Sequence, residues 1–133
     1  MELESCVQIK NEWDVVAVRQ LGRKVAKELG FGTVDQARIT TAISELARNI
    51  FLYAGHGEIC IHKLHENGQL GLKIVSIDEG PGIEDIRKVM EDGFTTSGGL
   101  GAGLPGIKRL MDEFDIQSKV NSGTTIIIVK WLR

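Results

Sequence analysis

Two side chains able to do chemistry together stand four positions apart in the segment TTAISELARNI. They are Glu45 and Asn49, and side chains at this spacing share one face of a helix. A carboxylate can accept the proton of a hydroxyl as a general base, and an amide oxygen is a hard ligand suited to Mg²⁺. This face points away from the apolar stripe that runs from Ile39 to Ile50, so a solvated polar face is the alternative interpretation. The helix alone does not choose between the two.

A second group with chemical potential ends an apolar run, in the segment VSIDEGPGI. Asp78 closes the run, and Gly80 and Gly82 come directly after it. Asp, Gly and Pro are the ordinary residues of turns, so a plain turn explains the segment. A functional interpretation places the Asp78 carboxylate in a pocket, where it accepts a hydrogen bond from an amino donor such as the exocyclic amine of adenine. The glycines would then let the backbone approach a flat ring closely.

The third group is the glycine-rich stretch TTSGGLGAGLPGIKRL at residues 95–110. It contains a literal GxGxxG from Gly101 to Gly106, which is the spacing of dinucleotide-binding loops. Such a loop follows a strand and precedes an acidic residue by about 20 positions, but DGFTTSGG is not a strand pattern and Ile126 occupies the distant position. A Walker-type phosphate loop ends in Gly-Lys-Ser/Thr, which GIKR does not supply. Both interpretations are therefore rejected.

The same stretch is better explained as a cradle for phosphate at the start of a helix. Pro105 suits the first turn, where its missing N–H costs nothing, and free backbone N–H groups before it meet the positive end of the helix dipole. Glycines let such N–H groups converge on an anion, and nearby hydroxyls add donors. The residues assigned to the cradle are Thr95, Thr96, Ser97, Gly99, Gly101 and Gly103.

Helix and strand patterns around these groups predict how they are positioned. Asn11 and Gly30 bracket a first helix, and Thr33-Val-Asp-Gln36 is a capping-box pattern that opens a long helix to about Ala54. Asn67-Gly68 predicts a two-residue hairpin. The expected strands are 6–10, 57–66, 69–78, 115–120 and 124–132, and the expected helices are 12–29, 33–54, 84–91 and 104–114. Because strands come in hairpins, we expect an α+β sandwich whose mixed or antiparallel sheet carries helices on one face.

The size, charge and cysteines of the chain limit the classes of function. Its 133 residues fit one domain, 1–133, and a net charge of −2 gives no indication of a nucleic-acid or membrane partner. The sequence shows no signal-peptide pattern and no apolar run of the ~18 residues that a membrane span needs. Cys6 and Cys60 lie in alternating apolar runs, so we interpret them as buried free thiols rather than a disulfide or a metal pair. These features predict a cytoplasmic protein.

Taken in order, the three groups resemble the motifs of the Bergerat-fold ATPase superfamily. A fourth motif, Gly123-Thr124 at the start of the last strand run, completes the order. The superfamily includes Hsp90, type II topoisomerases, mismatch-repair ATPases, sensor histidine kinases and anti-sigma-factor serine kinases. The resemblance covers nearly the whole chain from about residue 6. It implies a two-layer α/β sandwich with a mixed sheet and helices on one face.

Within the superfamily, the sequence is similar to the RsbT-type serine/threonine switch kinases of bacterial stressosomes, most closely over 12–50 and 87–114. The similarity implies a kinase that transfers the γ-phosphate of ATP, with Mg²⁺, to serine or threonine of STAS-domain antagonist and co-antagonist proteins. The kinase is then released to bind and activate a PP2C-type phosphatase in the sigma-B general stress pathway. The alternatives are an anti-sigma-factor serine kinase that binds a sigma factor directly, and a nucleotide-sensing binding module without transfer activity.

The resemblance also implies a role for each motif residue. Glu45 would be the base that activates the protein hydroxyl, and Asn49 would hold Mg²⁺. Asp78 would bind the adenine amine, and Thr124 would support Asp78 through a hydroxyl or water contact. Residues beneath the ring and in the lid and phosphate loop would complete the site, namely Gly80, Gly82, Thr96, Ser97, Gly99, Gly101, Gly103 and Leu104.

Overall fold

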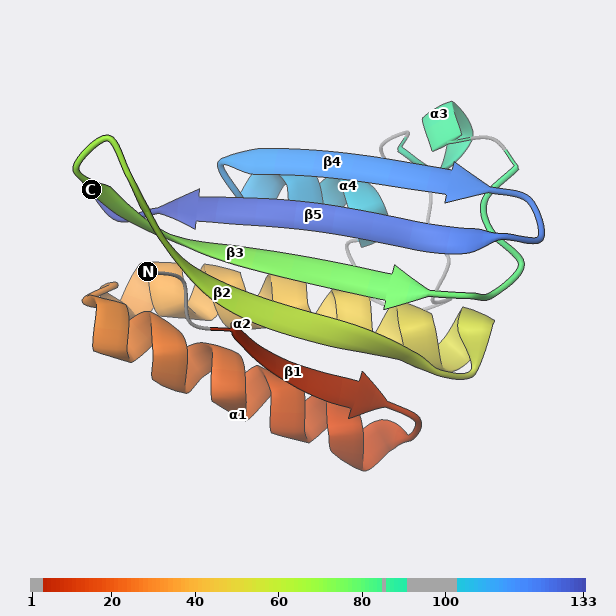
Figure 1. Cartoon of the computed structure of the whole chain (residues 1–133), viewed down its shortest axis with the longest axis horizontal. Coiled ribbons are helices and arrows are strands. Elements are labelled where there is room, and N and C mark those ends of the chain that lie inside the picture. The colour runs from red at the N-terminus through yellow and green to blue at the C-terminus, as the bar shows by residue number, and fades with distance from the viewer. Residues whose placement is uncertain (1–3, 85, 91–102) are drawn as a thin grey trace.

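The computed structural model describes residues 4–84, 86–90 and 103–133, and it has two layers (Figure 1). Helices α1, α2 and α4 lie on one face of a five-stranded sheet with the order β1-β2-β3-β5-β4. The strands are β1 Glu4–Ile9, β2 Gly57–Glu66, β3 Gln69–Asp78, β4 Glu113–Lys119 and β5 Gly123–Trp131. The helices are α1 Glu12–Leu29, α2 Thr33–Asn49, α3 Ile86–Val89 and α4 Gly103–Leu110, with a π-helical turn η1 at Ile50–Ala54.

The α+β sandwich with helices on one face is confirmed, and its sheet is antiparallel at every pairing between the described strands. The mixed sheet that the resemblance implied is therefore not found. The connections explain the difference. Both β2–β3 and β4–β5 are hairpins, and the two antiparallel helices α1 and α2 return the chain so that β2 runs against β1 (Figure 1).

Helix α1 has the ends that the sequence predicts. Asn11 is its N-cap, and the side chain of Asn11 accepts a hydrogen bond from the Asp14 N–H at 3.2 Å. The Asp14 carboxylate in turn accepts from the Asn11 N–H, which completes a capping box. Gly30 follows the helix with φ of 101°, the left-handed conformation that glycine adopts without steric cost.

Helix α2 begins at Thr33, but the capping box predicted from Thr33 to Gln36 is wrong. Gly32 is the N-cap and offers no side chain. The Gln36 side chain instead donates to the Phe31 carbonyl at 2.7 Å, so it ties the helix to the preceding loop. The predicted extension to about Ala54 is confirmed, because the chain continues from Asn49 into η1.

The hairpin between β2 and β3 fixes where Asp78 lies. Asn67 and Gly68 have positive φ values of 51° and 78°, as a two-residue turn that matches the strand twist requires. From that turn the register runs to the far end of both strands, where Asp78 pairs with Gly57. On its other side Asp78 pairs with Thr124 of β5. The second and fourth sequence motifs are thus neighbours across one ladder.

The core lies between the helices and the sheet. The predicted apolar stripe of α2 and η1, from Ile39 to Ile50, is buried in this core. Burying one such aliphatic side chain contributes about 1.5–3 kcal/mol, so this layer is the main source of stability. The largest fully buried side chains are Ile9, Ile39, Ile43, Leu46, Ile50, Ile59, Ile61, Leu72, Ile74, Ile107, Ile128 and Val18.

Cys6 and Cys60 form a disulfide, so the prediction of two free thiols is wrong. They lie directly opposite each other in the antiparallel β1–β2 pair, with Cα atoms 4.0 Å apart. The sequence interpretation failed because it used the separation of 54 residues along the chain, whereas the register of the two strands decides which side chains meet.

The two later helices are shorter than the sequence predicts. Of the expected helix 84–91 the structure describes Ile86–Val89, and α4 ends at Leu110 rather than at residue 114. The chain must turn there, because β4 begins at Glu113. None of the helices among the described residues is long and apolar enough to cross a membrane.

Candidate active site

Glu45 lies near the end of α2, and its side chain is buried. The residue is 5% exposed, because α2 contacts α1, α4 and the sheet. Its Oε1 accepts a hydrogen bond from Arg48 Nη1 at 3.0 Å, and its Oε2 has no partner among the described residues. Buried polar atoms are nearly always paired, so the unpartnered Oε2 makes Glu45 a candidate functional residue. The solvated polar face considered from the sequence does not hold for Glu45.

Asn49 follows Glu45 by one helical turn. It lies where α2 ends, close in sequence to the segment that contacts the Asp78 turn. It is the last residue of α2, it is half-buried, and the π-helical turn η1 starts directly after it. Such turns occur frequently at functional sites. At the end of η1, Ala54 touches the turn after β3, since a Cβ added to Gly80 would lie 2.7 Å from the Ala54 Cβ. The end of the long helix and the Asp78 turn are therefore in contact.

Asp78 is held by its own turn and by β5. Its Oδ1 accepts the Gly80 N–H at 2.9 Å, which closes the turn. The neighbouring strand approaches so closely that a Cβ on Gly123, whose φ is 88°, would lie 2.0 Å from the Asp78 carbonyl oxygen. Thr124, the strand partner of Asp78, is buried. Asp78 and Thr124 are thus ladder partners, and the predicted contact through the Thr124 hydroxyl stays a prediction.

Gly82 anchors the same loop to the β4–β5 turn. Its φ is 77°, and an added Cβ would lie 2.2 Å from the Lys119 carbonyl oxygen. The Asn121 N–H also donates to the Pro81 carbonyl at 2.8 Å. Contacts with Ala54 and Lys119 give Gly80 and Gly82 structural reasons to be glycine, and their position beneath a ring stays a prediction.

The glycine-rich stretch is described only at its end. Gly103 opens α4 with a positive φ of 64°, and Leu104 and Pro105 are buried in the first turn, as the sequence predicts for Pro105. The other residues assigned to the cradle or lid, Thr95, Thr96, Ser97, Gly99 and Gly101, lie outside the described residues. The phosphate cradle therefore stays a prediction.

Ser118 is a site residue that sequence reasoning missed. Its Oγ accepts the Ile83 N–H at 2.7 Å, donates to the Gly123 carbonyl at 3.0 Å and lies 2.8 Å from Thr124 Oγ1. One hydroxyl thus joins the loop after β3 to the start of β5. Ser118 and Thr124 stand opposite each other in the β4–β5 pair, a register that the predicted bounds 115–120 and 124–132 do not give.

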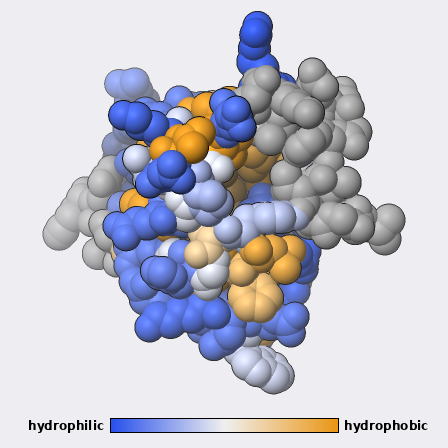
Figure 2. All heavy atoms as spheres, turned by 90° about the vertical axis from the view of Figure 1, so that its right-hand side faces the viewer, coloured by the Kyte–Doolittle hydropathy of each residue, from blue (hydrophilic) through white to orange (hydrophobic). Residues whose placement is uncertain are grey.

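Figure 2 shows the end of the molecule where β3 ends and the helical turn η1 lies. Hydrophobic side chains, in orange, lie on this surface among hydrophilic ones. Exposed apolar residues come from the elements that meet at this end, and they are Leu52, Tyr53, Ile77 and Val120. Exposed apolar groups next to a polar site suit contact with another macromolecule.

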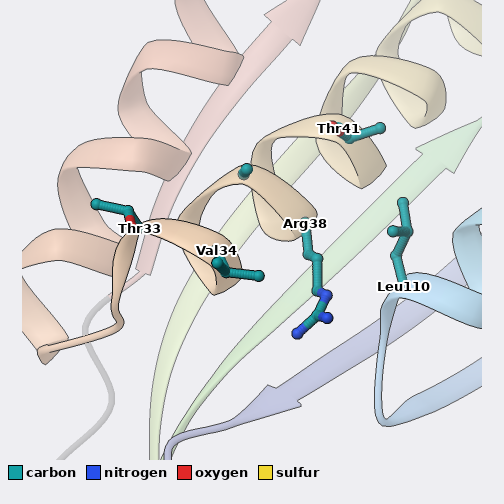
Figure 3. A pocket seen from close by; sticks show the side chains of 6 residues that line it. Thr33, Val34, Arg38, Thr41 and Leu110 are labelled. Atoms are coloured by element: carbon teal, nitrogen blue, oxygen red, sulfur yellow. The ribbon is translucent and has the colours of Figure 1, made fainter.

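Two other features of the described residues were considered for a role. Cys6, Glu58 and Cys60 bring three potential metal ligands together on β1 and β2, but the two cysteines are joined in the disulfide. A groove of about 460 Å³ runs between the first half of α2 and Leu110 (Figure 3). Its lining residues are Thr33, Val34, Ala37, Arg38, Thr41 and Leu110, and no predicted site residue is among them.

The family model described as histidine kinase-, DNA gyrase B- and HSP90-like ATPase matches residues 34–133. A protein named serine/threonine-protein kinase RsbT from Bacillus subtilis (strain 168) is 71% identical over 133 residues, which is the whole of both chains. A protein named anti-sigma F factor from Caldanaerobacter subterraneus is 31% identical over 107 residues, covering 75% of this chain and 73% of the relative.

Solved structures show the same fold at low sequence identity. The RsbU and RsbW domains of a Mycobacterium tuberculosis protein match with a TM-score of 0.65 and 19% identity, over 100% of this chain and 33% of the other. A mycobacterial sensor histidine kinase, MprB, matches with a TM-score of 0.56 and 17% identity, over 97% of each chain.

Proposed function

The chain belongs to the family of histidine kinase-, DNA gyrase B- and HSP90-like ATPases, and from this premise we propose that it is an ATP-dependent protein serine/threonine kinase. The observation that carries the proposal is the buried Glu45 with its unpartnered Oε2, one helical turn before Asn49. A module that only bound nucleotide would not need a buried carboxylate oxygen left without a partner. The full-length similarity to a protein named serine/threonine-protein kinase supports the same activity.

In the proposed mechanism, Glu45 acts on the substrate hydroxyl. Its Oε2 takes the proton as the hydroxyl oxygen bonds to the γ-phosphorus of ATP and the bond to ADP breaks. The orphaned Oε2 fits this role because an ionised carboxylate oxygen accepts hydrogen bonds and has no competing donor among the described residues. Glu45 later releases the proton to solvent.

The other motif residues would bind the nucleotide. Asn49 would hold Mg²⁺ through its amide oxygen, and the metal would neutralise charge on the phosphates. Asp78 uses Oδ1 for its own turn, so Oδ2 is the oxygen that would accept the adenine amine. Thr124 would support Asp78 from the opposite strand. Residues 95–104 would cradle the phosphates, as the sequence predicts.

For partners, we propose a STAS-domain antagonist and its co-antagonists as substrates, and a PP2C-type phosphatase as the protein activated after release. The similarity to the protein named RsbT supports this assignment, and the exposed apolar side chains at the site end suit protein contact. Residues 1–133 would act as one unit in the cytoplasm.

The test is transfer of labelled phosphate from ATP to the purified STAS-domain antagonist. We expect transfer by the wild-type chain with Mg²⁺, and a loss of roughly 100-fold or more in Glu45→Ala with nucleotide affinity retained. Full transfer by Glu45→Ala would remove Glu45 as the base. Nucleotide binding by the wild type without transfer to any STAS-domain substrate would favour the sensing module.

A second candidate, a kinase that binds a sigma factor directly, is favoured by the similarity to anti-sigma F factors. The two candidates predict different partner proteins. They can be told apart by immobilising the chain on an affinity column and asking which purified proteins it retains in the presence of ATP. Retention of a purified sigma factor, with no retention of the phosphatase or the STAS-domain proteins, would select the second.

A further inference from the structure

Glu45 has a neighbour that the proposed function does not use. Arg48 follows it by three residues on α2, and Arg48 Nη1 lies 3.0 Å from Glu45 Oε1. The two ends of this ion pair differ in environment, because the Glu45 side chain is 7% exposed and the Arg48 side chain is 47% exposed. A buried carboxylate is thus paired with a cation that reaches it from the surface.

The first consequence concerns where the Glu45 carboxylate lies. A hydrogen bond between charged groups is stronger than a neutral one, so the contact with Arg48 restricts the rotamers open to the Glu45 side chain. A general base must lie within hydrogen-bond reach of the proton that it takes. Arg48 therefore helps to hold Glu45 in one position.

The second consequence concerns the two oxygens of Glu45. Arg48 occupies Oε1, and Oε2 is the oxygen without a partner among the described residues. Because both residues stand on one rigid helix, the contact also fixes the rotation of the carboxylate. It leaves Oε2 as the accepting atom.

We propose that Arg48 is a positioning residue for the phosphoryl-transfer reaction, which holds the Glu45 carboxylate in place and reserves Oε2 as the proton acceptor. This inference rests on the proposed kinase function. It assigns Arg48 no contact with the nucleotide, so nucleotide affinity does not depend on it.

The helix carries a matched control for this pair. Arg38 and Asp35 are also three residues apart on α2, with Nη1 and Oδ1 2.9 Å apart, but both side chains are substantially exposed at 49% and 34%. Arg38 lines the groove of Figure 3, and Glu45 is not among the residues that line it. An ordinary surface ion pair predicts equal effects for the two arginines, whereas the proposal predicts an effect for Arg48 alone.

The experiment compares Arg48→Gln, Arg48→Lys and Arg38→Gln with the wild type. Nucleotide affinity is measured by calorimetry, and kcat is measured for transfer to the STAS-domain antagonist. We expect Arg48→Gln to keep nucleotide affinity and to lower kcat by roughly 10-fold or more. Arg48→Lys should restore part of the activity, and Arg38→Gln should match the wild type.

Three results would overturn the proposal. They are an unchanged kcat in Arg48→Gln, a loss that appears in nucleotide affinity instead of kcat, and an equal loss in Arg38→Gln. If Arg48→Gln does not fold, kcat of Arg48→Lys decides, since a lysine keeps the charge but cannot reproduce the guanidinium geometry and should lower kcat by less.

A separate measurement distinguishes failure of this inference from failure of the kinase function. The carboxyl carbon of Glu45 is observed by NMR in the wild type, Arg48→Gln and Arg38→Gln. A chemical-shift change in Arg48→Gln alone supports the contact even if no transfer is found, and an identical shift in all three proteins refutes it.

Discussion

Asp78 lies directly opposite Thr124 in the antiparallel pair of β3 and β5. The two residues come from motifs that stand 46 positions apart in the sequence. Their contact is enforced by a glycine, because Gly123 lets β5 approach the Asp78 carbonyl. A hydroxyl of Ser118 then ties Thr124 to the loop that follows Asp78. The backbone at Asp78 is thus held from the strand beside it.

Asp78→Asn is expected to weaken ATP binding by roughly 10-fold or more. The new side chain keeps an oxygen that can accept the Gly80 N–H, so the turn is preserved. Its amide nitrogen would replace the oxygen proposed to face the adenine amine, and two donors would then oppose each other. Calorimetric titration with ATP measures the change.

Asp115→Asn is the matched control for charge, because Asp115 is exposed on β4 and lies in no predicted motif. It should leave ATP affinity unchanged. Equal affinities for wild type and Asp78→Asn would remove Asp78 from the adenine site.

Thr124→Val is expected to weaken ATP binding by less than Asp78→Asn does, and Thr124→Ser should restore it. Valine has nearly the shape of threonine, so the change removes the hydroxyl with little effect on packing. Ser118 keeps its bonds to the Ile83 N–H and the Gly123 carbonyl, which limits the loss of stability to about 1 kcal/mol. If Thr124 acts through Asp78, the double variant binds ATP no worse than Asp78→Asn alone, and fully additive losses would show that the residues act separately.

Gly123→Ala is expected to destabilise the fold by about 2 kcal/mol or more, because a Cβ would lie 2.0 Å from the Asp78 carbonyl oxygen and φ is 88°. Gly68→Ala separates these two causes. Gly68 has a φ of 78° but no atom within 4 Å of an added Cβ, so it should lose only about 1 kcal/mol. Urea unfolding measures both, and equal losses would contradict the close approach of β5 to Asp78.

Local sequence signals predicted the parts of this fold that depend on neighbouring residues. Asn67-Gly68 fixed the β2–β3 hairpin, and both strands have the predicted bounds because the turn alone sets their register. Asn11 and Gly30 likewise defined α1. Thr33 is not the N-cap, because Gly32 occupies that position. The loop before α2 sets where the helix begins.

Contacts between distant segments account for what the sequence did not predict. Cys6 meets Cys60 only once β1 has paired with β2, and Glu45 is buried only once helices and sheet surround α2. Arg48 was visible three positions after Glu45, but its importance depends on that burial. A helical sequence pattern predicts on which face of the helix a side chain lies. It does not predict which other elements of the fold pack against that face.

The Asp112 carboxylate makes the stability of the fold depend on pH in the acid range. Burial acts to raise its pKa, but the Trp131 N–H, the Arg133 guanidinium and the Lys130 ammonium outweigh burial and lower the pKa below the ordinary value of 3.8. The Trp131 N–H lies 2.7 Å from Oδ2, and Arg133 Nη1 lies 3.1 Å from Oδ1. The carboxylate thus joins the turn before β4 to the end of β5.

The lowered pKa predicts how stability changes with pH. The unfolded chain binds the Asp112 proton more readily, so the contribution is fully present above the ordinary pKa of 3.8 and is lost as pH falls through the lower folded value. Asp112→Asn keeps an oxygen for the Trp131 N–H but removes the charge that pairs with Lys130, which is buried. We expect this variant to be about 2 kcal/mol less stable at neutral pH and to lose less stability than the wild type between about pH 5 and about pH 2. Urea unfolding across that range tests it, with Asp115→Asn as the exposed control, and parallel curves for wild type and Asp112→Asn would show that Asp112 does not carry this acid response.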